Sequence, residues 1–88
     1  MLVMNTNNTL ELIRGYASAG RYEVEDHARA RMRQRNVLEG DLRSALSKAF
    51  RCSLQDNERW RVEGPDLDGD DLTVIVVIED GLIVVTLY

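Results

Sequence analysis

The sequence predicts one small α+β domain over residues 1–88, with two to three N-terminal helices packed on a three- to four-stranded antiparallel sheet. Three observations support this fold class. A chain of 88 residues is long enough for one domain and too short for two. Apolar residues recur at helical spacing in the first half and alternate with polar ones in the second half. Helices followed by strands along the chain favour helices packed on one face of an antiparallel sheet.

Three segments of the first half have helical patterns. Leu10, Ile13 and Ala17 recur at helical spacing. The second segment contains no Gly, Pro or β-branched residue, so nothing in it opposes a helix. In the third, an apolar stripe on one face begins at Leu38 and ends at Ala49. The predicted helices span residues 9–18, 27–35 and 39–49.

The second half alternates with a period of two. Trp60 and Val62 are separated by charged residues, as in a half-buried strand. Two runs rich in Val, Ile and Leu follow, and Asp80-Gly81 between them is a strong hairpin signal. Residues 65–71 are predicted to form a loop. The predicted strands span residues 51–55, 59–63, 72–78 and 82–87.

The net charge of −4 is distributed unevenly along the chain. Residues 27–61 hold nine of the eleven basic residues, whereas residues 62–88 hold seven acids and no base. Ten of the eleven basic residues are arginine, which binds phosphate or carboxylate through two parallel hydrogen bonds. The net acidity argues against broad, non-specific nucleic-acid binding, but it leaves room for a local arginine-lined site.

Cysteine usage and hydropathy predict a cytoplasmic protein with no membrane span. Cys52 is the single cysteine, so neither an internal disulfide nor a cysteine-rich zinc site can form. Residues 1–5 lack the basic and long apolar regions of a signal peptide. The longest apolar run, residues 74–78, is far shorter than the roughly 20 residues that a membrane span needs.

The second predicted helix contains the most informative pattern. At about 100° per residue, His27, Arg31 and Arg35 form a line beside the apolar stripe of Ala28 and Met32. Two arginines can hold a phosphate and stabilise charge that develops on it. A histidine, with an ordinary pKa of about 6.5, can move protons near neutral pH. The alternative is a solvated arginine face with a histidine that caps or packs the helix.

Four further features have weaker signals. Arg59 and Arg61 share one strand face, where they either complete a phosphate site or face solvent. Tyr88 lies on the face of Thr86 and either orients a substrate or closes the sheet edge. The aspartates of residues 66–71 resemble a calcium loop, but its sixth position is Asp71 instead of glycine and its twelfth is Val77 instead of glutamate, so a polar turn is expected. Cys52 is expected to be buried. No metal site and no cofactor is predicted.

Over about residues 10–88 the chain resembles the bacterial family catalogued as domain of unknown function 4258, which is grouped with the RelE/ParE-like toxins of toxin–antitoxin systems. The resemblance depends on a His-Ala-x-x-Arg-Met-x-x-Arg pattern that begins at His27. An acidic-capped helix, an arginine-bearing strand and a Thr-x-Tyr ending at Tyr88 follow this pattern. RelE-like nucleases are typically basic, whereas this chain is acidic.

The resemblance implies a RelE-like fold and metal-independent cleavage of RNA, in which the ribose 2′-hydroxyl attacks the adjacent phosphate. It makes His27 the general acid or base and makes Arg31 and Arg35 phosphate ligands, with Arg61 and Tyr88 as further candidates. The implied partners are RNA and a small cognate antitoxin. The net acidity and the lack of a second obvious proton-transfer residue favour the alternative, a non-catalytic protein-interaction module such as a gyrase-directed toxin. A purely structural orphan domain is a third alternative.

Overall fold

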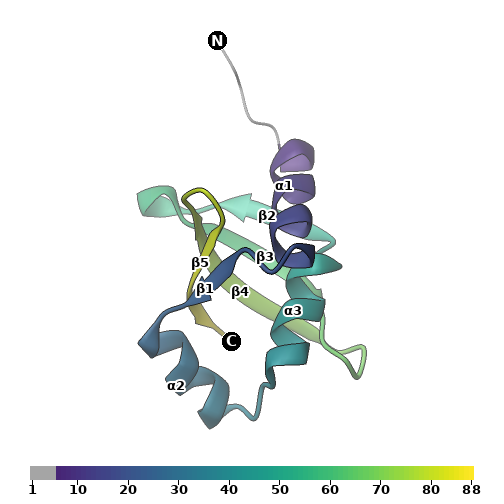
Figure 1. Cartoon of the computed structure of the whole chain (residues 1–88), viewed down its shortest axis with the longest axis vertical. Coiled ribbons are helices and arrows are strands. Elements are labelled where there is room, and N and C mark those ends of the chain that lie inside the picture. The colour runs from purple at the N-terminus through teal and green to yellow at the C-terminus, as the bar shows by residue number, and fades with distance from the viewer. Residues whose placement is uncertain (1–5) are drawn as a thin grey trace.

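A computed structural model describes residues 6–88, which form three α-helices, a short 3₁₀ helix and five strands (Figure 1). The helices are α1 (Thr6–Ser18), α2 (Asp26–Gln34), α3 (Glu39–Ser47) and the 3₁₀ helix η1 (Asp56–Glu58). The strands are β1 (Tyr22–Val24), β2 (Arg51–Leu54), β3 (Trp60–Pro65), β4 (Asp71–Ile78) and β5 (Leu82–Leu87). The predicted α+β class is confirmed. The expectation that residues 1–5 form no signal peptide lies outside the described residues.

The five strands form one mixed sheet in the order β1-β5-β4-β3-β2. Strands β2 to β5 pair antiparallel to their neighbours, as the predicted meander required. The prediction of three to four antiparallel strands missed β1, which pairs parallel to β5 with Tyr22 opposite Leu82. Three residues are too few to show a period of two. This strand forms because the end of the chain lies beside it, and local sequence does not encode that pairing.

The structure differs from the predictions at several element boundaries and in the position of Leu38. Helix α1 begins at Thr6, three residues before the predicted start at residue 9. Leu38 is 67% exposed, although it was predicted to belong to the apolar stripe of α3, because it precedes the helix in an extended conformation. Pro65 was predicted to lie in a loop but ends β3, where its missing N–H group is tolerated.

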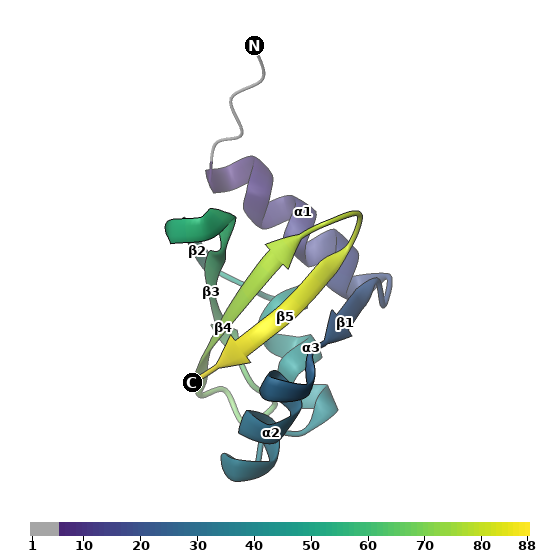
Figure 2. The ribbon, with the colours of Figure 1, turned by 90° about the vertical axis from the view of Figure 1, so that its left-hand side faces the viewer.

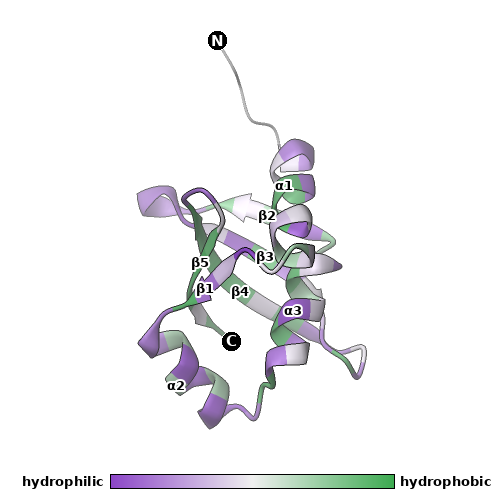
Figure 3. Cartoon of the chain, in the orientation of Figure 1, coloured by the Kyte–Doolittle hydropathy of each residue, from purple (hydrophilic) through white to green (hydrophobic). Residues whose placement is uncertain are grey.

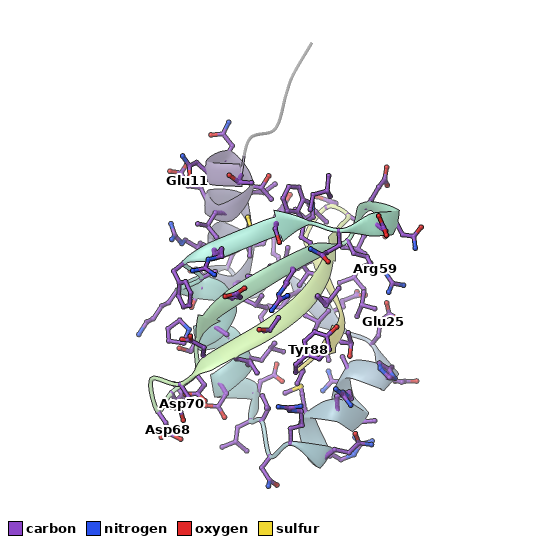
Figure 4. The ribbon with its side chains drawn as sticks, turned by 180° about the vertical axis from the view of Figure 1, so that it is seen from behind. Glu11, Glu25, Arg59, Asp68, Asp70 and Tyr88 are labelled. Carbon is purple, nitrogen blue, oxygen red and sulfur yellow. The ribbon has the colours of Figure 1, made fainter. Side chains whose placement is uncertain are left out.

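Helices α1 and α3 cover one face of the sheet, and the core lies between these two layers (Figures 1 and 2). Burying one aliphatic side chain in this core contributes roughly 1.5–3 kcal/mol to the stability of the fold. The opposite face of the sheet has no helix over it in the described part of the chain (Figure 4). Figure 3 contrasts the hydrophobic β5 with the mainly hydrophilic α2. The fully buried side chains include Ile13, Leu42, Leu46, Val62, Val74 and Val84.

Gly64 allows α3 to pack closely on β3. A Cβ atom added at Gly64 would overlap the backbone carbonyl group of Ala45 on α3. Gly64 is buried, so neither element can move aside into solvent without opening the core. Gly15 is the opposite case, because an added Cβ on this exposed helical residue would have no neighbour within 4 Å.

The Asp41 carboxylate joins the start of α3 to the loop between β3 and β4. One oxygen, Oδ2, accepts a hydrogen bond from the N–H of Leu38 at 3.0 Å. The other, Oδ1, accepts one from the N–H of Leu67 at 3.0 Å. These two bonds, to Leu38 and then to Leu67, lower the pKa of the Asp41 carboxyl group. The charged form of Asp41 therefore stabilises both the helix start and the loop.

We expect Gly64→Ala to lower the free energy of unfolding by about 1–3 kcal/mol, because the new methyl group forces α3 and β3 apart. We expect Gly15→Ala to raise it by about 0.5–1 kcal/mol, because alanine favours an exposed helix. Urea unfolding followed by the fluorescence of Trp60 measures both. Equal stabilities of wild type and Gly64→Ala would contradict this packing.

We expect Asp41→Ala to destabilise the protein at neutral pH. We also expect the variant to lose less stability than wild type as the pH is lowered. The folded-state pKa of Asp41 is lowered. Its contribution is therefore present above the unfolded value of about 3.9 and is lost as pH falls through the folded value. Thermal unfolding between about pH 2 and pH 7 measures this effect. The matched control is Asp68→Ala, which removes an exposed acid from the loop between β3 and β4 and leaves both Asp41 side-chain acceptors in place. Its stability should change with pH nearly as in wild type.

Candidate functional site

The candidate site begins with the way α2 is attached to β5. The N–H of Glu25, at the junction of β1 and α2, donates to the carbonyl of Val84 at 3.0 Å. Ala28 and Met32 are buried, which confirms the predicted apolar stripe. Asn36 has a left-handed φ of 55° and ends the helical segment. Helix α2 is thus fixed with one edge along the end of β5.

Arg31 is the residue of α2 that contacts the end of the chain. Its Nε donates a hydrogen bond to the carbonyl of Leu87 at 3.2 Å. Its guanidinium carbon lies 6.0 Å from the centroid of the Tyr88 ring, at the limit of a cation–π contact. Two of the residues predicted from sequence, Arg31 and Tyr88, therefore come together although they lie far apart in the sequence.

We call the place where Arg31 of α2 meets the end of β5 the corner. A β-bulge in β5 determines which side chains face it. Ile75 pairs with Thr86 and Val76 pairs with Val84, so Val85 is an extra residue in the strand. After the bulge, Leu87 enters the core with 0% exposure, while Thr86 and Tyr88 lie on the open face of the sheet. The N–H of Tyr88 donates to the carbonyl of Thr73 at 2.9 Å, which holds the last residue on β4.

Thr86 and Tyr88 line a shallow hollow of about 260 Å³ on the open face of the sheet. Ile75 forms its floor, and Arg59 and the η1 turn form its far wall. Figure 4 shows Tyr88 and Arg59 on the same side of the molecule. Sequence alternation placed Arg59 on the face of Arg61 but gave no reason to prefer it. Its position beside Tyr88 depends on the pairing of β3, β4 and β5.

Arg61 also lies on the open face, but a carboxylate already contacts it. Its Nε is 3.5 Å from one oxygen of Glu63. The other oxygen of Glu63 is 3.4 Å from Arg51 on the neighbouring strand. Glu63 thus lies between two guanidinium groups. Both arginines are exposed, whereas the Glu63 side chain is 19% exposed. Ion pairs with solvent-exposed arginines contribute little net stability, so an arriving phosphate can compete with Glu63 for the arginines.

His27 and Arg35 lie one helical turn before and after Arg31. Both side chains are exposed, and the backbone N–H of Arg35 donates to the carbonyl of Arg31 at 3.0 Å. Side chains four residues apart on a helix have Cβ atoms about 5–6 Å apart, so all three can reach one extended ligand. Among residues 6–88, the side-chain contact between predicted site residues joins Arg31 to Tyr88.

The remaining polar features of the sequence have structural roles. Cys52 is buried, and burial raises the pKa of its thiol, which makes it a poor nucleophile. The Asp66 carboxylate accepts hydrogen bonds from the N–H groups of Asp68 and Asp70, both at 2.9 Å, and so closes the predicted polar turn. Within residues 6–88, no three His, Cys, Asp or Glu side chains are grouped so that they could hold a metal ion.

Comparison with known proteins assigns the chain to a family. Residues 24–88 match the family described as Domain of unknown function (DUF4258). The chain belongs to this family. The match begins at the last residue of β1 and leaves α1 outside. No curated protein and no solved structure matches the chain.

The matched part of this DUF4258 chain contains the whole candidate site. It includes α2, β3 and β5, and therefore every residue predicted for the site. Helix α1, which precedes the match, contributes to the core and to none of the contacts at the corner. In the described part of the chain, no helix has the length and apolar composition to cross a membrane.

Proposed function

We propose that this DUF4258 chain is a toxin-type endoribonuclease that binds single-stranded RNA where α2 meets the end of β5. The observation that carries the proposal is the Arg31–Tyr88 contact beside the hollow lined by Thr86 and Arg59. An arginine can bind a phosphate through paired hydrogen bonds, and a tyrosine whose ring lies near its guanidinium can orient the adjacent ribose. We also propose that the chain has a RelE-like fold and is related to the RelE/ParE-like toxins.

The proposed reaction uses His27, Arg31 and Arg35 from one edge of α2, together with Tyr88 and Arg61 from the sheet. The ribose 2′-hydroxyl attacks the adjacent phosphorus, forming a new P–O bond and breaking the P–O5′ bond. His27 takes the proton of the 2′-hydroxyl as the new P–O bond forms and returns it to the leaving 5′-oxygen. Arg31 stabilises the charge that develops on the phosphate, and Arg35 holds the neighbouring phosphate. Tyr88 orients the scissile phosphate group, and Arg61 contacts the RNA further along the sheet. The products are a 2′,3′-cyclic phosphate and a free 5′-hydroxyl.

The shape of the hollow supports a polymeric substrate. Its volume of about 260 Å³ lies below the roughly 300–1,000 Å³ usual for sites that enclose a small molecule. It is also bordered by an open sheet face with exposed Arg51, Arg59 and Arg61. A chain that lies across such a surface gains several weak contacts, whereas a small ligand would gain few. The proposed physiological partner is a small cognate antitoxin that covers this surface in the cytoplasm.

A non-catalytic protein-interaction module is the second candidate. The Glu63 bridge favours it, because a carboxylate between Arg51 and Arg61 weakens attraction for RNA along that part of the sheet. The net charge of −4 acts in the same direction. In this case the open face binds a partner protein through Arg31 and Arg59, and no RNA is cut.

We expect the purified chain to cleave a single-stranded RNA oligonucleotide in the presence of EDTA. Arg31→Ala should slow cleavage about 10²–10³-fold, because it removes charge stabilisation from the transition state. His27→Ala should slow it about 10²–10⁴-fold through loss of proton transfer. The matched control is Arg33→Ala, which removes an exposed arginine from the same helix and should change the rate little. Electrophoresis of end-labelled RNA measures all four rates.

RNA with 2′-O-methyl groups at every ribose distinguishes this reaction from other cleavage. It should bind with similar affinity and remain intact, because its 2′-oxygen has no proton to give up and cannot attack. If neither naked RNA nor mRNA on translating ribosomes is cut, the enzyme proposal is wrong. Recovery of a stable protein partner by the Arg31-containing surface, without RNA cleavage, would establish the second candidate.

A further inference from the structure

A second hollow, of about 340 Å³, lies at the end of the sheet opposite α2. Its lining residues come from α1, η1, the ends of β2 and β4 and the start of β3. None of its residues lines the hollow beside Tyr88. The lining residues are Leu12, Leu54, Glu58, Trp60, Val77, Ile78 and Glu79.

The lining of this hollow is mainly apolar and accessible. Leu54 is 60% exposed at the end of β2, and its cross-strand partner Trp60 is only half-buried. Val77 and Ile78 continue the apolar surface on β4, and Leu12 adds to it from α1. Adjacent exposed aliphatic and aromatic side chains in a concave site are typical of an interaction surface.

Two carboxylates on the rim give the hollow a negative charge. Glu58 and Glu79 are both exposed, and no lysine or arginine lines the hollow. Glu58 has a left-handed φ of 58°, directly after Asn57 with a φ of 62°. This conformation is unfavourable for glutamate by about 1–2 kcal/mol, and residues held in this way concentrate at functional sites. The η1 turn therefore keeps the Glu58 carboxylate on the rim at the expense of local strain.

We infer that this hollow binds a short amphipathic segment of a partner protein, whose aliphatic side chains enter the hollow and whose lysines or arginines contact Glu58 and Glu79. Charge complementarity selects this occupant. The apolar floor binds aliphatic side chains, and the two rim carboxylates attract basic segments and repel acidic ones. Helix-in-groove recognition uses the same combination of apolar anchors and flanking charges. The inference does not depend on the proposed nuclease activity, since the two hollows share no residue.

Trp60 provides the measurement, because it is the only tryptophan of the chain and it lines the hollow. The probe is a synthetic helical peptide with leucines on one face and lysines elsewhere. We expect a saturable change in Trp60 fluorescence that weakens as salt is raised. The double variant Glu58→Gln/Glu79→Gln should weaken binding at least about fivefold. Leu54→Ala should weaken it with little change in its salt dependence.

Matched controls separate the two parts of the recognition. A peptide with glutamates in place of the lysines should not bind, and neither should a peptide with serines in place of the leucines. Asp68→Asn removes an exposed acid elsewhere on the chain and should bind the lysine peptide like wild type. The inference is overturned if the glutamate or serine peptide binds as well as the lysine–leucine peptide, or if the Glu58/Glu79 variant is unaffected.

Other occupants give different results. If a second copy of the chain fills the hollow, Trp60 fluorescence will change with protein concentration and sedimentation will show a dimer that Leu54→Ala dissociates. If the chain's own N-terminal residues fill it, a variant lacking residues 2–5 will bind the peptide while the full chain does not. Either result would overturn the inference of a partner segment. RNA cleavage, measured on the same samples, is expected to be unchanged by Glu58→Gln/Glu79→Gln.

Discussion

The pairing of β5 on both of its edges is the constraint on which the rest of the structure depends. Strand β5 lies between β1 and β4 and also carries α2 on its flank. Helix α2 has nine residues, and isolated helices of fewer than about 12–15 residues are marginal in water. Its position is therefore set by the hydrogen bond from Glu25 to Val84 and by the burial of Ala28 and Met32. Without β5 in place, Arg31 has no fixed relation to the sheet.

Local sequence patterns predicted most of the elements and the face of each one. The absence of Gly, Pro and β-branched residues located α2, and helical spacing gave its buried stripe. Alternation located β3, whereas two apolar runs around Asp80-Gly81 located β4 and β5. The same reasoning missed β1, whose three residues form a strand only because the chain's last segment lies beside them. It also misplaced Leu38, since an apolar residue just before a helix can face solvent when the chain enters in an extended conformation.

Prediction of the site was limited in the same physical way. Helical spacing alone put His27, Arg31 and Arg35 on one line, and that much is a property of one element. The contact between Arg31 and Tyr88 joins residues far apart in sequence, so it depends on the mixed sheet that the patterns did not reveal. Arg59 and the contact of Glu63 with Arg61 likewise follow from strand register. Residue types predicted candidate chemistry, whereas tertiary pairing decided which candidates meet.

The bulge at Val85 makes the length of β5 as important as its composition. In a regular strand, a residue two positions after Val84 would face the core, and Leu87 would point outward. The single extra residue exchanges these roles, so an aliphatic side chain enters the core while the hydroxyl groups of Thr86 and Tyr88 face outward. An insertion or deletion of one residue between Val84 and Leu87 would therefore exchange the inward- and outward-facing positions without altering any side chain. In this family, gaps in that short interval should be rarer than substitutions.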